Sequence, residues 1–163
     1  LQLGGPNGRL DKMGEAAQAV AVEMAEKLDL TCPARHWQTD RQPMVDIANW
    51  FSTLTGALGK MGQDIALMAQ NEVGEVTLSG GGTSSAMPHK NNPVLAESLV
   101  TLARFNAVQV SGMHHALVHE NERSGSAWAL EWMIMPQMAV ATGAGLRNAR
   151  DLLKQVTFSA ADI

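Results

Sequence analysis

The sequence contains no tyrosine and a single cysteine, and only 4% of its 163 residues are aromatic. Because Cys32 has no second thiol to pair with, we interpret it as a small structural residue near a turn. No apolar run approaches the roughly 20 residues that a helix needs to span a bilayer, and residues 1–8 lack the basic and apolar segments of a signal peptide. Acidic residues outnumber basic ones by 16 to 12, unlike a nucleic-acid-binding surface. We therefore expect a cytoplasmic protein that binds neither membranes nor nucleic acids.

Hydrophobic residues make up 45% of the chain and include ten methionines. Alanine, leucine and methionine take the place of aromatic and β-branched residues, which favours helices over strands. The length is sufficient for one domain with a core. We predict an all-α fold with a single helical domain over residues 1–163. The chain starts without methionine and both of its ends are abrupt, so we also expect it to be part of a longer one.

Apolar residues recur at alternating steps of three and four in several segments, which is the spacing of one helical face. The pattern predicts a first helix over residues 10–28 and a second over residues 44–68. A third helix is expected from Pro93 to about His119. A fourth should carry Trp132 to Leu153 on one face, with Pro136 marking its start or a kink.

The second segment has an unbroken apolar seam and would form a helix roughly 40 Å long. A helix of that length needs long partner helices, either in this chain or in identical copies. Its glycines indicate close approach by a neighbouring helix, and they are Gly56, Gly59 and Gly62. Asn106 and Gln109 fall on the apolar seam of the third helix, so they must find polar partners if they are buried.

The stretch from Gly80 to Pro93 concentrates the reactive side chains of the sequence. Its three glycines suit a loop that opens and closes over a ligand, and we predict a catalytic loop over residues 79–93. We expect Asn92 to cap the next helix, with Pro93 at its first position. Lys90 and Asn92 would then lie at the positive end of that helix, where an anion binds favourably. The alternative is a solvated linker in front of a helix.

Seven residues of this loop match the signature loop of the fumarase/aspartase superfamily, and they are Ser84, Ser85, Met87, Pro88, Lys90, Asn92 and Pro93. Thr83 stands where that family usually has glycine. The segment Asn-Glu-Val-Gly-Glu-Val over residues 71–76 also resembles the family, as do the long helices on either side of the loop. The resemblance extends over nearly all of the chain and implies the central long-helix domain of this family.

The resemblance also implies roles for the loop residues. Members of the family use a loop serine to remove a proton next to a carboxylate, and this base corresponds to Ser84, with Ser85 beside it. Lys90 and Asn92 would hold a substrate carboxylate, helped by the neighbouring Thr83 and Met87. A buried, closed site must support this chemistry, because a serine hydroxyl is a weak base.

Two further residues are expected to complete the site. In the family, a glutamate at the position of Glu97 pairs with a catalytic histidine from another subunit, and we find no matching histidine motif in this chain. Arg123 would bind a second carboxylate, for which its bidentate geometry is suited. The alternative for Arg123 is a surface ion pair with Glu120 or Glu122.

The family resemblance implies a homotetramer whose sites combine loops from three subunits, without a cofactor. A metal site is not expected, although three histidines lie close together at positions 114, 115 and 119. Adjacent histidines point to different faces of a helix, and no Asp or Cys ligand stands at an obvious position.

Two branches of the family compete as the nearest match. The Ser-Ser-Ala-Met-Pro form is shared with adenylosuccinate lyases, which release fumarate by elimination. The element Ala-Trp-x-x-Glu-Trp, carried here by Trp128, Glu131 and Trp132, is more similar to the bacterial carboxymuconate cycloisomerases of aromatic catabolism. The leading interpretation is therefore lactonisation of a small tricarboxylate, 3-carboxymuconate. A catalytically silent helical scaffold, as in the lens crystallins of this family, remains the non-enzyme alternative.

Overall fold

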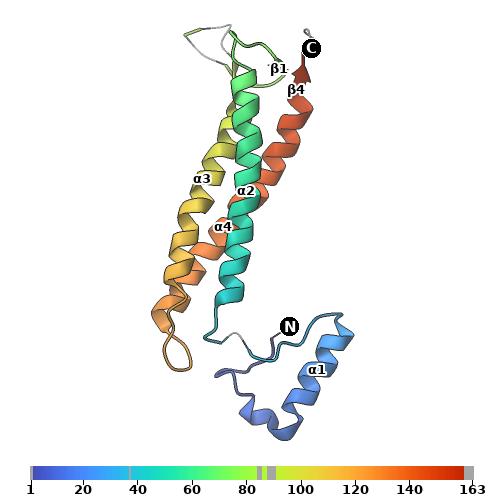
Figure 1. Cartoon of the computed structure of the whole chain (residues 1–163), viewed down its shortest axis with the longest axis vertical. Coiled ribbons are helices and arrows are strands. Elements are labelled where there is room, and N and C mark those ends of the chain that lie inside the picture. Colours follow the sequence, from blue (N-terminus) through green and yellow to red (C-terminus); the bar gives the residue numbers. More distant parts are fainter. Residues whose placement is uncertain (1, 37, 84–85, 88–90, 160–163) are drawn as a thin grey trace.

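The computed structural model describes residues 2–36, 38–83, 86–87 and 91–159. Three long helices lie side by side: α2 (Gln42–Met68), α3 (Val94–His115) and α4 (Gly125–Gln155) (Figure 1). A short helical segment, η1 (Asp11–Ala16), leads into α1 (Ala17–Lys27), which lies beyond one end of the bundle (Figure 1). The predicted all-α, long-helix fold is confirmed. Within the described ranges, no helix is both long and apolar enough to cross a membrane.

Two small antiparallel sheets at the opposite end of the bundle were not predicted. Strand β1 (Val76–Leu78) pairs with β4 (Val156–Phe158), and β2 (Gly82–Thr83) pairs with β3 (Asn91–Asn92). The first sheet joins the chain after α2 to the end of α4, and the second closes the base of the glycine-rich loop (Figure 1). With two or three residues per strand, these pairs are too short to leave an alternating pattern in the sequence.

The ends of the predicted helices differ from the observed ones for local reasons. The first predicted helix is interrupted at Gly14, where a φ of 56° breaks the helical conformation. Pro93, not Asn92, is the N-cap of α3, and the helix ends at His115. Asn92 is unavailable as a cap because it belongs to β3, where its side-chain amide donates to the Gly82 carbonyl at 3.2 Å.

Of the two roles considered for Pro136, the start of the last helix is contradicted, and the kink stays a prediction. Helix α4 begins at Gly125, and Pro136 lies in its interior. Ser124 supplies the N-cap: its side-chain oxygen accepts a hydrogen bond from the backbone N–H of Ala127 at 3.5 Å. This cap satisfies a donor that the first turn would otherwise leave unpaired, so the helix can begin well before the proline.

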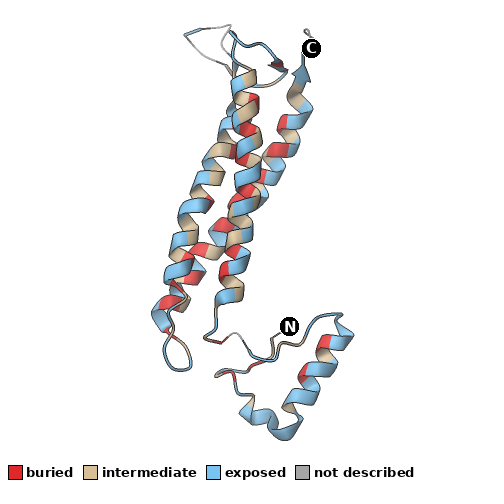
Figure 2. Ribbon diagram, viewed as in Figure 1, coloured by how far each residue is buried: buried red, intermediate tan, exposed pale blue. Residues whose placement is uncertain are grey.

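The core runs along the facing sides of the three long helices (Figure 2). One buried cluster lies toward the loop end and contains Ile65, Val76, Ala96, Leu99, Ala149 and Leu152. A second lies toward the other end and contains Val45, Ala48, Met113, Ile134 and Met138. Between them, Asn106 donates to the hydroxyls of Thr55 and Thr142 at 3.2 and 3.0 Å. Burying each large apolar side chain contributes roughly 1.5–3 kcal/mol, so these clusters hold the bundle together.

Small residues let α2 and α3 approach each other closely. Gly59 and Gly62 are buried, and a Cβ at Gly62 would lie 2.6 Å from the Ala96 carbonyl oxygen. The close approach predicted for these glycines is confirmed, but Gly56 faces open space. Of the large apolar residues on the predicted seam of α2, Ile65 is the one that is fully buried.

Candidate active site

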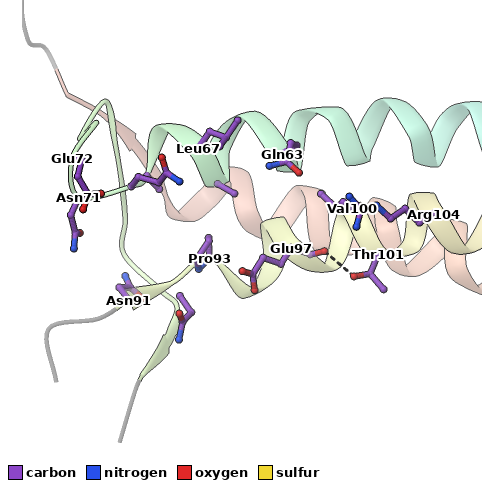
Figure 3. A pocket seen from close by; sticks show the side chains of 14 residues that line it. Gln63, Leu67, Asn71, Glu72, Asn91, Pro93, Glu97, Val100, Thr101 and Arg104 are labelled. Carbon is purple, nitrogen blue, oxygen red and sulfur yellow. Dashed lines mark hydrogen bonds between the residues drawn. The ribbon is translucent and has the colours of Figure 1, made fainter. Parts of the chain in front are cut away.

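A polar cleft of about 530 Å³ lies between the end of α2 and the first half of α3 (Figure 3). Its polar lining consists of Gln63, Gln70, Asn71, Glu72, Asn91, Asn92, Glu97, Thr101 and Arg104. Asn92 and Glu97, which were predicted from the sequence to be site residues, therefore line the same cleft. It also includes the start of the segment over residues 71–76 that resembles the family. Carboxylates, amides and a guanidinium together suit a polar, charged ligand.

The base of the glycine-rich loop is fixed beside this cleft by side-chain amides. Asn91 donates to the Leu78 carbonyl at 3.0 Å, and Asn92 donates to the Gly82 carbonyl at 3.2 Å. The side chain of Asn91 occupies the place where a Cβ of Gly81 would lie, so a larger residue there would collide with it. A primary amide carries two N–H groups, which leaves Asn92 a second donor for a ligand.

Glu97 lies in the first turn of α3 and its side chain is exposed to the cleft (Figure 3). Its backbone N–H donates to the Pro93 carbonyl at 2.9 Å, and its carbonyl accepts from the Thr101 hydroxyl at 3.1 Å. Among the residues that the structure describes, no cation pairs with the Glu97 carboxylate. An anionic side chain is electrostatically favoured near a helix N-terminus, and this one is exposed to a partner that enters the cleft.

The other expected loop residues are placed as follows. Thr83 lies in β2, paired with Asn91, and Met87 is 45% exposed. Ser84, Ser85 and Lys90 lie outside the described residues. The roles expected for these five residues stay predictions.

Arg123 is not brought together with the cleft. It belongs to the connection between α3 and α4, at the end of the bundle away from the loop (Figure 1), and the 22 residues of α3 span roughly 33 Å. Its guanidinium carbon sits 4.1 Å from the ring centroid of Trp128. In the described parts of the chain it forms no ion pair with Glu120 or Glu122, so the surface pair considered above is not observed.

A buried ion cluster at this second end was not predicted. The Arg41 guanidinium donates from Nε to Oε1 of Glu131 at 2.7 Å and from Nη2 to Oε2 at 2.5 Å. The Nε2 atom of His119 lies 3.8 Å from Glu131 Oε1, and its Nδ1 accepts the Ser124 backbone N–H at 3.1 Å. Glu131 was noted only as part of a motif, and nothing in the local sequence pointed to Arg41, 90 positions earlier.

The described residues contain no group of three or more side chains suited to hold a metal ion. His119 accepts a hydrogen bond from Ser124 and faces Glu131 at 3.8 Å, whereas His114 and His115 are exposed at the end of α3. The structure thus defines an all-α protein with a polar cleft at one end of a long-helix bundle and a buried ion cluster at the other.

Comparison with known proteins gives the family. Residues 11–112 match the model of the lyase family, so the chain belongs to this family, the fumarase/aspartase superfamily. A 3-carboxy-cis,cis-muconate cycloisomerase of Pseudomonas aeruginosa is 39% identical over 157 residues, covering 94% of this chain and 34% of the relative. A nitrosuccinate lyase of Streptomyces davaonensis is 36% identical over 175 residues, covering 98% of this chain and 36% of the relative.

The fold is also found in solved structures. The crystal structure of the 3-carboxy-cis,cis-muconate lactonizing enzyme from Pseudomonas putida superposes with a TM-score of 0.86 at 38% identity. The match covers 99% of this chain and 37% of that structure. The chain therefore spans about a third of the length of the relatives that it matches.

Proposed function

We propose that the protein carrying this chain is a 3-carboxy-cis,cis-muconate cycloisomerase, an enzyme that closes a lactone ring on a tricarboxylate. Four cycloisomerases of this name are 34–39% identical over at least 94% of the chain. The structural observation that carries the proposal is Glu97, a carboxylate beside Asn92 in a polar cleft at the base of the loop, with no ion pair to any residue that the structure describes. Both the Glu97 carboxylate and the Asn92 amide belong to the proposed site.

The chemistry is an intramolecular addition. A carboxylate oxygen of the substrate forms a C–O bond to one alkene carbon, and the π electrons move to the carbon next to another carboxylate as an enolate-like pair. Ser84 delivers the proton to that carbon, and in the reverse direction it removes it. Lys90 and Asn92 hold the carboxylate on which negative charge develops, and ring closure then depends mainly on orientation.

We further propose that the active protein is a homo-oligomer, such as a tetramer, whose active sites are shared between subunits. Glu97 lies in the first turn of α3 and Arg123 follows its last turn, at the other end of the bundle, so a single site can contain both only if they come from different copies. An apolar groove between α3 and α4 supports this arrangement, lined by Leu102, Phe105, Pro136, Val140, Ala141 and Ala144. Apolar surface of this kind is typical of an interface between chains. Light scattering should report a multiple of the chain mass, and a monomer would count against the shared site.

The test is a spectrophotometric assay of the full protein, with 3-carboxymuconate and adenylosuccinate offered in parallel. We expect turnover of the muconate and its nearly complete loss in Ser84→Ala, with the helical circular dichroism unchanged. Ser111→Ala is the matched control, because Ser111 is an exposed serine of α3 far from the loop. Turnover of adenylosuccinate alone would assign the elimination reaction instead. No turnover of either substrate would favour a silent helical scaffold, and an active Ser84→Ala variant would exclude Ser84 as the proton-transfer group.

A further inference from the structure

Arg123 is held by an aromatic pair at the start of α4. Its guanidinium carbon lies 4.1 Å from the Trp128 ring centroid, a cation–π contact. Trp132, one helical turn further on, packs against Trp128 in an edge-to-face arrangement with centroids 4.9 Å apart and planes at 70°. The spacing of four residues places both indoles on the same side of the helix. Trp128 is therefore fixed by its helix and by a second ring.

The backbone next to Arg123 is fixed as well. Ser124 caps α4, and its own N–H donates to Nδ1 of His119. The His119 side chain is buried beside Glu131. Both the main chain and the guanidinium of Arg123 thus have defined positions before any ligand binds, which lowers the entropy that binding must overcome.

A guanidinium that stacks through its face keeps its N–H edges for hydrogen bonding. Arg123 is only half-buried, and within the described residues it pairs with no carboxylate. We propose that Trp128 is a positioning residue that orients the Arg123 edge toward a substrate carboxylate. This inference rests on the proposed function, because it takes Arg123 as a carboxylate contact of the site.

The alternative is a purely structural stack, in which Arg123 merely covers the indole with its aliphatic stem. The two roles differ in how Trp128 and Arg123 depend on each other. If Trp128 positions Arg123, replacing Trp128 should weaken substrate binding only while Arg123 is present. A structural tryptophan has the same effect in both backgrounds.

The first experiment is a double-mutant cycle on the assembled protein with 3-carboxymuconate. We expect Trp128→Ala to raise KM about tenfold with little change in kcat, and Trp128→Phe to stay within about threefold of the wild type because a phenyl ring retains the contact. In an Arg123→Ala background, Trp128→Ala should add nothing. The control is Trp50→Ala, an exposed tryptophan of α2 that lies outside the proposed site. Equal increases in KM in both backgrounds would overturn the proposal.

The second experiment does not depend on catalysis. Calorimetric titration with propane-1,2,3-tricarboxylate, an unreactive tricarboxylate, should show binding that weakens about tenfold in Trp128→Ala and is retained in Trp128→Phe. Arg123→Ala should weaken binding at least as much. Binding without lactonisation would reject the proposed reaction and keep this inference. Binding that is insensitive to Arg123 or to Trp128 would overturn the inference, even in an enzyme that turns over 3-carboxymuconate.

Discussion

The Nε atom of Arg41 donates to Oε1 of Glu131 over 2.7 Å, which joins the segment before α2 to the first third of α4. The two side chains are 12% and 3% exposed, so this is a buried bidentate ion pair. Such a pair adds little net stability compared with apolar residues, but breaking it leaves an uncompensated buried charge. The ion pair therefore fixes how the two segments meet.

We expect Glu131→Ala to lower the free energy of unfolding by about 3 kcal/mol, because the Arg41 guanidinium then stays buried without its counter-charge. Urea denaturation measures this loss. The control is Asp64→Asn, which removes the exposed ion pair with Lys60 and should cost less than about 0.5 kcal/mol. Equal, small losses in both variants would mean that the Arg41 side chain moves out into water.

Three glycines of α2 provide a second prediction, in which alanine substitution changes the stability in opposite directions along one helix. A Cβ at Gly62 would lie 2.6 Å from the Ala96 carbonyl, and one at Gly59 would lie 2.6 Å from the Ala103 Cβ. Gly62→Ala and Gly59→Ala should each destabilise the bundle by about 1–3 kcal/mol. Gly56 has open space around it, so Gly56→Ala should stabilise by about 0.5–1 kcal/mol through helix propensity. Thermal unfolding of the three variants would contradict this packing if all three shifted in the same direction.

The long helices could be predicted from the sequence because an apolar stripe with the period of a helix is a strong local signal. Some of the features that it misses depend on distant partners, and one depends on a local cap. Asparagine is a residue type that often caps helices, yet Asn92 lies in β3 and pairs with Gly82 of β2. No local sequence pattern reveals this pairing. The early start of α4 depends on Ser124, whose capping role was hidden in a charged segment.

The candidate site was only partly predictable for a similar reason. The loop motif pointed to Asn92 and Glu97, and the structure brings both to one cleft. The motif that contains Trp128 and Glu131 was recognised as a resemblance only. The contacts of these residues depend on the folded helix: Trp128 contacts Arg123, whereas Glu131 faces inward to Arg41.

The end of α4 carries a carboxylate whose titration can be tested. A hydrogen bond from Lys154, at 2.9 Å, is the main cause that lowers the pKa of Asp151 below its ordinary value, and Arg150 contributes less. In NMR titrations, Lys154→Gln should therefore raise the pKa of Asp151 more than Arg150→Gln does. Because the folded-state pKa lies below the unfolded one, the linked stability is present above about pH 4 and is lost as the pH falls through the folded value. The opposite order of the two variants would contradict this assignment.

Asn106 forms a polar layer between the two apolar clusters of the core. It is fully buried, and it donates to the hydroxyls of Thr55 and Thr142. Each threonine hydroxyl in turn donates to the carbonyl four residues earlier in its own helix, at 2.8 Å. The Oδ1 atom of Asn106 has no hydrogen-bond partner among the described residues. The layer thus gains two hydrogen bonds and loses the hydration of one carbonyl, so its net contribution to stability should be small.

This balance predicts losses of different size for two substitutions that keep the branched shape of the side chain. Asn106→Leu should change the free energy of unfolding by no more than about 1 kcal/mol, because both threonine hydroxyls keep their acceptors. Asn106→Asp should cost at least about 3 kcal/mol at pH 7, because it buries a charge without a cation. That cost should shrink at pH 5, where the introduced carboxyl can take up a proton. Urea denaturation at the two pH values measures the loss of stability in each variant. Equal losses for Asn106→Leu and Asn106→Asp at pH 7 would mean that the polar layer, and not the apolar clusters, holds the middle of the bundle together.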